Sequence, residues 1–597
     1  MKKVVLLSLF AVVLSSFSSA QTPVASSKPN IIPESQIHVG MKGVAYTVFQ
    51  GVKPEPMGVE VLGILRGQNG PKGDIILVRL QGSKPEYTGV VAGMSGSPVY
   101  FDGKLAGALA FRIGEFSKEP IAGVTPIEQM LEIDQFDTRP GNTQVATSAP
   151  VSDATRTSGP AATSDSSVAG FANMIKPIET PLVFSGFTED AVRRFAPQVA
   201  SAGIVPVMGA GSVDPDAKQP EPLEPGSAVS AILVRGDLNI AATCTVTYMD
   251  PKQLLACGHP LMQFGNVDLP MTKADVLATL PSPANAFKIV NATEQVGTFV
   301  QDRHFGIMGR FDRQPQMIPV TLNIHGSAGP KTFHYEVLNN PKLTPVAMMA
   351  TVFSVLQGVN DSGEDVTYRM AGAIDVNGYP EVKMKNMFAP ADGGAPTAFQ
   401  VAMSLGDRFG RIYDNPYSKP SIKGVEMDFD MVRERRWARL ESARTDVTEV
   451  RPGDDIVIET VLRPYRGEQI VRHIPVKIPT SAAKGNLRIL VSDGDTLDRM
   501  RRVGGPHAAK LDLASTIALL NKEHANDRVY VSLLEANPQA MVEDKVMPAL
   551  PLSVMNVMEG MRGTQDMVVV GESNVDEAST PVDYVISGAH IITVTVK

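Results

Sequence analysis

The chain has 597 residues, of which 43% are hydrophobic and 20% are charged, and its formal net charge is −8. This length exceeds what one hydrophobic core normally serves, so we expect three or four domains. The acidic balance and the lack of a basic cluster in the sequence argue against nucleic acid as a partner.

The first twenty residues have the pattern of a secretory signal peptide. Lys2 and Lys3 precede an apolar run over residues 4–14, and small residues up to Ala20 offer a cleavage site before Gln21. The run is too short to span a bilayer with ease, and no later segment is apolar for long enough to do so. The sequence therefore predicts an exported protein of the periplasm or cell envelope, with no transmembrane segment in the mature chain.

Residues 21–137 are expected to form a β-rich module closed by a helix. Strand candidates rich in β-branched residues lie at 59–65 and 75–80. The closing helix is predicted to begin with Thr125 as its N-cap, with Pro126 at the first helical position and Glu128 completing a capping box.

Within this module, Ser95 lies on a glycine-flanked turn, Gly93-Met94-Ser95-Gly96-Ser97-Pro98. A tight hairpin is predicted directly afterwards, because Asp102-Gly103 separates two short apolar runs. The glycines allow the backbone to bend sharply. The amides of Gly93 and Ser95 can then point at one spot, as the oxyanion hole of an acyl-transfer enzyme requires.

Residues 138–170 are rich in Ser, Thr, Ala, Pro and Gly, which predicts a flexible linker. A second β-rich module follows at 171–325, with strands expected at 228–234, 241–248 and 254–257. The last of these leads to His259, which is well placed at a strand end to face a cleft. A serine hydroxyl needs such a neighbouring base before it can act as a nucleophile.

The two cysteines of the chain, Cys244 and Cys257, are equidistant from the turn at Asp250-Pro251. In a regular hairpin centred on that turn they lie opposite each other, at a spacing that a disulfide tolerates. The sequence therefore predicts a disulfide in an exported protein, with two buried thiols as the alternative.

Beyond residue 325 we expect an α+β module at 326–445 and a β-sandwich-like domain at 446–597. One helix is predicted from a Thr344 cap, with Pro345 first, to Gly358. In the last domain, strands are expected at 456–462, 470–478 and 591–596, with a helix at about 508–522.

Several of these motifs together resemble the SpoIVB-like serine peptidases, a family named after a stage IV sporulation protein. The matching blocks are Val39-Gly40-Met41-Lys42-Gly43, Thr47-Val48-Phe49-Gln50-Gly51, Val59-Glu60-Val61-Leu62-Gly63, the Ser95 turn, Pro120-Ile121-Ala122-Gly123-Val124-Thr125-Pro126, Thr245-Val246-Thr247-Tyr248, Ala256-Cys257-Gly258-His259-Pro260 and Phe305-Gly306-Ile307-Met308-Gly309. The resemblance implies a mostly β fold with a chymotrypsin-like double β-barrel peptidase unit. It also implies Ser95 as nucleophile, His259 as general base, and the Gly93 and Ser95 amides as oxyanion donors.

Two features depart from the family pattern. The serine block precedes the histidine block here, which is the reverse of the family order, although a triad is defined by geometry and not by chain order. The third, acidic member is also not specified: Asp74, Glu86 and Asp268 are all candidates, and a Ser–His dyad is the alternative. His304 and Asp302 are expected to form a surface pair, and no metal or cofactor is predicted.

The leading functional hypothesis is an endopeptidase that cleaves envelope proteins or itself. The competing hypothesis is an inactive peptidase-fold scaffold or binding protein of the envelope. A third is a recognition protein that works with another protease.

Overall fold

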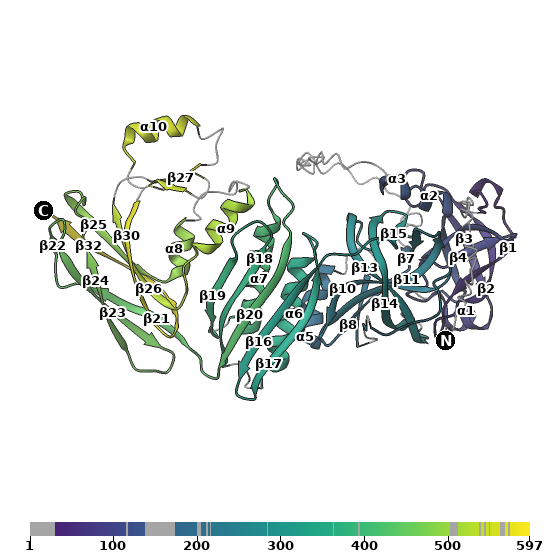
Figure 1. Ribbon diagram of the computed structural model, residues 1–597, viewed down its shortest axis with the longest axis horizontal. Helices are drawn as coiled ribbons and strands as arrows, with labels where there is room; N and C mark the ends of the chain where they lie inside the picture. The colour runs from purple at the N-terminus through teal and green to yellow at the C-terminus, as the bar shows by residue number, and fades with distance from the viewer. Residues whose placement is uncertain are drawn as a thin grey trace, which may run out of the picture.

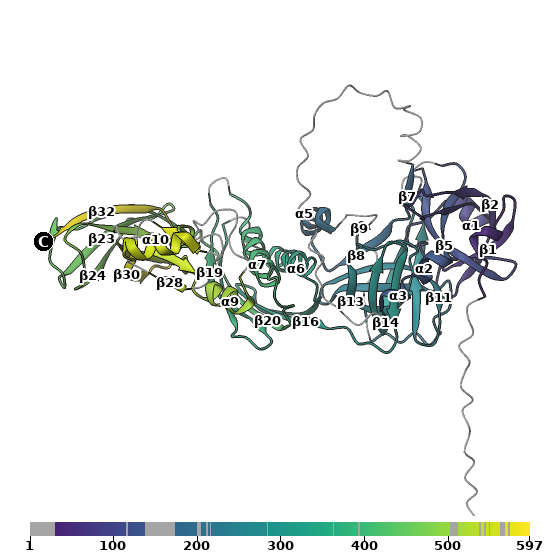
Figure 2. The ribbon, with the colours of Figure 1, turned by 90° about the horizontal axis from the view of Figure 1, so that it is seen from above.

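The structure is a computed structural model. It describes residues 30–597 except 115–116, 138–173, 200–203, 210–212, 215, 283–284, 362, 364, 392–393, 502–510, 536–538, 543–544, 548–549, 562–566 and 571–572. The predicted signal peptide and linker lie outside the described residues. The described chain is mostly β, as expected, and forms an elongated molecule with two barrels at one end and a sandwich at the other (Figures 1 and 2).

The N-terminal part contains a closed ring of six antiparallel strands. Pairing runs β1–β2–β3–β6–β5–β4 and returns from β4 to β1. Alternate residues of β2 and β3, such as Val59, Val61 and Val78, fill its core. The strands are β1 (Lys42–Thr47), β2 (Glu55–Leu65), β3 (Ile75–Gln81), β4 (Pro98–Phe101), β5 (Lys104–Ile113) and β6 (Ile121–Pro126), with short helices η1 (Glu34–Gln36) and α1 (Ser83–Thr88) beside them.

The second module contains another closed ring of six antiparallel strands. Its pairing runs β10–β13–β14–β15–β12–β11 and returns to β10. The strands are β10 (Ala228–Gly236), β11 (Asn239–Met249), β12 (Gln253–Ala256), β13 (Gly265–Leu280), β14 (Phe287–Arg303) and β15 (Gly306–Arg310). Strands β8 (Thr180–Ser185) and β9 (Ile204–Met208) extend the sheet from β11, and helix α5 (Glu189–Val199) follows β8.

The two rings share an apolar cluster that includes Ile127 and Met130 from the first module and Leu255 and Met308 from the second. Ile127 and Met130 belong to α2 (Ile127–Leu131), which is followed by α3 (Asp134–Asp137). This helix begins later than predicted, because Thr125 and Pro126 still pair with β5. The predicted capping box is wrong: Thr125 bonds elsewhere, and Glu128 accepts the N–H of Glu34.

A five-stranded layer continues from the second ring, because the end of β10 pairs with β17. The layer consists of β16 (Met317–Gly326), β17 (Gly329–Leu338), β18 (Thr367–Val376), β19 (Val382–Phe388) and β20 (Ile422–Val432). Helices α6 (Thr344–Val359) and α7 (Thr397–Tyr413) pack into the same core. The helix predicted here is confirmed as α6, although Leu343 is the N-cap and Asn360 the C-cap.

Two further sheets pack face to face at the C-terminal end and share one core. One has the order β24-β23-β21-β31 and the other β22-β32-β25-β26-β30. Their strands are β21 (Trp437–Arg444), β22 (Glu449–Val450), β23 (Asp455–Pro464), β24 (Ile470–Lys477), β25 (Gly485–Ser492), β26 (Arg528–Glu535), β30 (Ser573–Pro581), β31 (Val585–Ser587) and β32 (Ala589–Val596).

Smaller elements accompany the sandwich: α8 (Gly494–Arg501), α9 (Leu513–Asn521), α10 (Leu552–Met561), β27 (Gln539–Val542), β28 (Lys545–Met547) and β29 (Met567–Val570). The helix predicted at 508–522 is seen as α9, and its expected first residues lie partly outside the described chain. Among the described helices, none has the length and apolar character needed to cross a membrane.

Candidate active site between the two barrels

The Ser95 turn lies where the first ring meets the second. Gly93 and Gly96 both have φ of +93°, in the region that favours glycine. A Cβ at Gly96 would lie only 2.0 Å from the carbonyl oxygen of Thr245. Glycine is therefore required at position 96 for the turn to pack this closely against the second ring.

The hairpin predicted after the turn is confirmed. Phe101 pairs with Lys104, which leaves Asp102 and Gly103 as the two turn residues. Their φ angles are +51° and +73°, as a type I′ turn requires. The turn chemistry thus brings β5 back beside β4, and β5 in turn supports the serine loop through a hydrogen bond from Gly96 N–H to Leu109 O of 2.7 Å.

Strand β11 of the second ring holds the Ser95 turn by three hydrogen bonds. Thr245 N–H donates to Ser95 O at 2.8 Å. The hydroxyl groups of Thr245 and Thr247 donate to Gly93 O at 3.0 Å and to Gly96 O at 2.7 Å. These bonds fix the main chain of the turn and leave the side chain of Ser95 unengaged.

The Ser95 side chain is fully buried, and its Oγ has no hydrogen-bond partner among the described residues. The neighbouring Ser97 differs, because its Oγ donates to Met94 O at 2.6 Å. A buried hydroxyl without a partner is costly, so it calls for a functional explanation.

His259 is the second buried polar residue at this junction, with 2% of its surface exposed. Its Nδ1 lies 2.8 Å from the carbonyl oxygen of Pro260. A carbonyl oxygen can only accept, so Nδ1 carries the proton and Nε2 presents a lone pair. Nε2 has no hydrogen-bond partner among the described residues, and no hydrogen bond joins it to Ser95.

Burial lowers the pKa of His259, because the charged ring is disfavoured away from water, while main-chain groups of Pro260 and Ile178 act in the opposite direction. Burial therefore favours the neutral form of the ring. A neutral imidazole with a bare Nε2 is the form that a general base needs.

The three acids predicted as candidates have partners other than His259. Asp74 forms an ion pair with Arg66 at 2.8 Å, and the Glu86 carboxylate accepts the Gly82 N–H at 2.9 Å. Asp268 accepts the Gln316 N–H at 3.0 Å. The Pro260 carbonyl therefore makes the contact to Nδ1 that an acid makes in a triad.

Asp302, at the end of β14, supports the loop that carries this carbonyl. Asp302 is 2% exposed, and its carboxylate accepts the N–H groups of Leu261, Met262 and Phe264 at 2.8, 2.8 and 3.4 Å. Burial raises the pKa of Asp302 in spite of these bonds. The predicted surface pair with His304 is wrong, because His304 Nε2 lies 2.9 Å from Asn69 O instead.

The two N–H groups expected to act as oxyanion donors, those of Gly93 and Ser95, differ in whether they already make a hydrogen bond. The Gly93 N–H donates to Glu179 O at 3.1 Å and is already engaged. The Ser95 N–H makes no hydrogen bond to a described residue. An incoming carbonyl oxygen would have to displace Glu179 to receive both donors.

Lys288, on β14, lies against the same loop and is not among the predicted site residues. A Cβ at Gly93 would lie 3.4 Å from Lys288 Cδ, and the lysine Nζ bonds to Thr47 Oγ1 at 2.8 Å. The side chain is 1% exposed, and burial lowers its pKa to about 7. A lysine within a strand carries no sequence signal that it faces inwards.

Cys244 and Cys257 lie at disulfide distance, with Sγ–Sγ of 2.07 Å and Cα–Cα of 5.3 Å. The hairpin register predicted for them is wrong. Tyr248 pairs with Leu255, so the turn is centred on Pro251-Lys252, and a bulge then brings Val246 opposite Ala256. Cys257 reaches its partner from a left-handed conformation, with φ of +67°.

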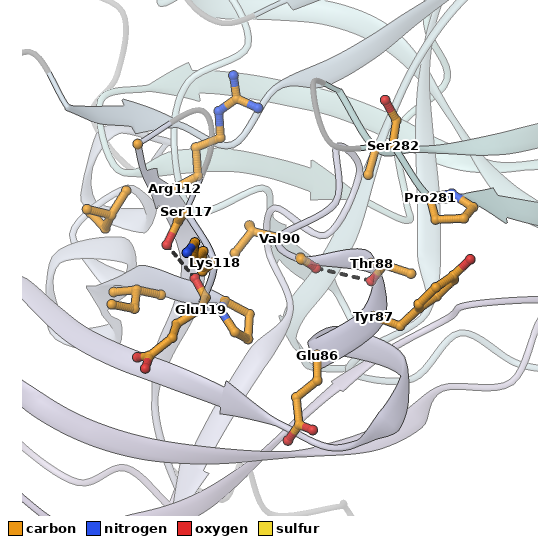
Figure 3. A pocket seen from close by; sticks show the side chains of 16 residues that line it. Glu86, Tyr87, Thr88, Val90, Arg112, Ser117, Lys118, Glu119, Pro281 and Ser282 are labelled. Atoms are coloured by element: carbon orange, nitrogen blue, oxygen red, sulfur yellow. Dashed lines mark hydrogen bonds between the residues drawn. The ribbon is translucent and has the colours of Figure 1, made fainter.

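A cavity of about 370 Å³ opens beside the end of β5. Figure 3 shows Arg112, Ser117 and Glu119 on one side of it and Thr88, Pro281 and Ser282 on the other. The cavity is lined by both modules, since Pro281 and Ser282 belong to the second.

Comparisons with protein-family models, with curated proteins and with solved structures gave no match for this chain.

Proposed function

We propose that the protein is an exported serine endopeptidase of the SpoIVB-like type, with a chymotrypsin-like double barrel that acts on envelope proteins or on itself. One observation carries the proposal. Ser95 and His259 are both buried at the junction of two six-stranded antiparallel rings, and neither Ser95 Oγ nor His259 Nε2 has a hydrogen-bond partner among the described residues. A hydroxyl that can donate and a ring nitrogen that can accept supply the chemistry of a nucleophile and its base, and the reaction requires the two groups to come within hydrogen-bond reach of each other.

In the proposed reaction, Ser95 Oγ attacks the carbonyl carbon of a peptide bond and its proton passes to His259 Nε2. The Nδ1–H···O=C bond to Pro260 keeps the ring in the required tautomer and stabilises the positive charge that forms. The tetrahedral oxyanion is received by the N–H of Ser95, joined by that of Gly93 once Glu179 moves away. His259 then gives its proton to the leaving amine, and water releases the acyl group by the same steps.

A second function, a peptide-binding scaffold without catalysis, is favoured by two observations. Ser95 and His259 are not hydrogen-bonded to each other, and the Gly93 amide is occupied by Glu179. The first observation describes a pair of groups that is not assembled for catalysis, and the second describes a site that the chain itself fills.

Labelling with a fluorophosphonate probe distinguishes the two functions. The peptidase predicts labelling of the wild-type protein, with loss in Ser95→Ala and near-complete loss in His259→Ala, because nucleophile and base act as a unit. Ser97→Ala is the matched control and should still be labelled. A Ser95→Ala variant that reacts as fast as the wild type, or a folded protein that stays unreactive even when Glu179 is replaced by Gln, would reject the peptidase.

A further inference from the structure

Residues 174–179 lie as an added strand along the end of β5. The pairing of β7 (Ile175–Pro177) is antiparallel, with Ile175 opposite Ile113 and Pro177 opposite Phe111. Hydrogen bonds extend it at both ends, from Gly114 N–H to Met174 O and from Ile178 N–H to Ala110 O, both 2.8 Å. An exposed sheet edge is a template for an extended peptide, and here the chain itself supplies that peptide.

This strand leads directly into the candidate active site. Ile178 is fully buried, and the carbonyl oxygen of the next residue, Glu179, accepts the N–H of Gly93. The end of the strand therefore contacts the serine loop directly. An extended substrate crossing the site would have to occupy the same place.

The side chain of Glu179 adds a specific contact. It forms an ion pair with Arg112 at 2.5 Å, and the two side chains are only 13% and 14% exposed. Arg112 Nε is also buried without a partner among the described residues, and Arg112 lines the 370 Å³ cavity (Figure 3). The guanidinium group of Arg112 therefore favours a carboxylate over a neutral side chain as its partner, because only a carboxylate supplies the opposite charge.

We propose that the edge of β5 at residues 110–114, the Gly93 amide and Arg112 form a binding site for extended polypeptides that carry an acidic side chain, and that residues 174–179 fill this site as an internal ligand. The inference rests on the proposed function in one respect, the substrate class. It names as substrates polypeptide segments whose Asp or Glu side chain pairs with Arg112. The binding site itself does not depend on catalysis.

The internal strand has a large advantage over any separate peptide. A tethered segment acts at an effective concentration in the millimolar range, so a free peptide competes poorly while the tether remains bound. Weakening the Arg112–Glu179 contact should therefore open the site without removing the groups that recognise the ligand.

The experiment measures binding in the Ser95→Ala background, where cleavage cannot occur. The probe is a fluorescent peptide with the sequence of residues 174–181, Met-Ile-Lys-Pro-Ile-Glu-Thr-Pro, and its partner carries Gln in place of Glu. Glu179→Gln should bind the acidic peptide about tenfold more tightly than the Ser95→Ala parent, and the Gln peptide about tenfold more weakly than the acidic one. Glu119→Gln is the control, because Glu119 lines the same cavity but pairs with Arg79.

A reciprocal variant keeps the test decisive. Arg112→Gln should bind the two peptides equally, because it lacks the guanidinium group that distinguishes the Glu side chain from Gln. If Glu179→Gln shows the parent's thermal unfolding and binds neither peptide, or binds both equally, the proposal is overturned. Peptide binding by the Ser95→Ala/Glu179→Gln protein, with no probe labelling of either the wild type or a Glu179→Gln variant that keeps Ser95, would instead reject catalysis and retain the peptide site.

Discussion

Thr125 and Gly258 are joined by a hydrogen bond that crosses from the first barrel to the second. Thr125 Oγ1 donates to the Gly258 carbonyl at 2.7 Å, although 133 residues separate them in the chain. Both residues are buried, so the bond is shielded from water. It ties the end of β6 to the residue directly before His259.

Thr125→Val should therefore loosen the histidine loop. The carbonyl of Gly258 would be left buried and unpaired, which costs about 1–3 kcal/mol of unfolding free energy. Labelling of Ser95 by the fluorophosphonate probe should slow as well. Thr125→Ser keeps the hydroxyl and should preserve both properties; a valine variant with unchanged stability and labelling would show that the bond is unimportant.

Asp302→Ala should disturb the same loop from the other side. Three N–H groups after His259 would lose their acceptor, and we expect a loss of about 2–4 kcal/mol, measured by denaturant unfolding. Asp268→Ala is the control, because Asp268 accepts a single N–H, and it should cost less than about 1 kcal/mol. Equal effects of the two variants would contradict the role given to Asp302.

Two variants of the cysteine pair separate the effect of the disulfide from the effect of the positive φ at position 257. Cys244→Ala/Cys257→Ala should lose at most about 3 kcal/mol, the chain-entropy contribution of so short a loop. Cys244→Ala/Cys257→Gly should be more stable than that variant by about 0.5–1 kcal/mol, because glycine adopts the positive φ of position 257 without strain. Intact mass before and after reduction with alkylation gives the bond directly, and two thiols that alkylate without reductant would refute it.

Lys288→Met should raise stability at pH 7, by about 1–3 kcal/mol, because it removes a buried amine that has a hydroxyl as its hydrogen-bond partner. The pKa of Lys288 is about 7 when folded, below the ordinary value of 10.5, so the unfolded chain binds more protons between these pH values. Wild-type stability should therefore gain from this group as pH rises from 7 to 10.5, and the advantage of the variant should shrink over that range.

The control for this variant is Lys273→Met, which should destabilise, because Lys273 is paired with Glu294 at 2.8 Å. Denaturant unfolding at about pH 7 and about pH 9.5 provides the comparison. An advantage of Lys288→Met that does not change with pH would assign the effect to packing and not to charge.

His524 in the C-terminal domain should give the opposite pH dependence. Burial alone would lower its pKa, but hydrogen bonds to Asp498 at 2.6 Å and Glu577 at 3.0 Å outweigh burial and raise it to about 9. A raised folded pKa contributes stability that is complete below about 6.5 and is lost as pH rises through about 9. His524→Gln should remove this loss, whereas His473→Gln, at an exposed histidine, should leave it in place.

Much of the fold could be predicted because it depends on local chemistry. Asp102-Gly103 specifies its turn through positive φ, and β2 and β3 follow runs of β-branched residues. Ser95 can be identified in the same way, since glycines on both sides of the serine mark a sharp turn. Such a turn is expected to expose the hydroxyl, and this expectation is wrong, because the second ring packs against the turn and Ser95 is buried.

The groups around the site could not be predicted for two physical reasons. Main-chain groups such as the carbonyls of Pro260 and Glu179 have no sequence signature, yet they contact His259 and Gly93. Asp302 and Lys288 are polar residues within strands, where alternation suggests a solvent-facing side, but tertiary packing turns both inwards.

Strand β10 has a practical consequence for dividing the molecule. Its first part pairs with β11 and β13 inside the second ring. Beyond the bulge between Ile232 and Val234 it pairs with β17 of the next layer, so the sheet runs across residue 325 without a break. A chain that ends at that residue would lack β17, the strand that pairs with the end of β10, and would also lack the last residue of β16. The unpaired backbone N–H and C=O groups left on β10 would promote aggregation. Expression of the two barrels alone should consequently give insoluble protein, and limited proteolysis should spare this junction.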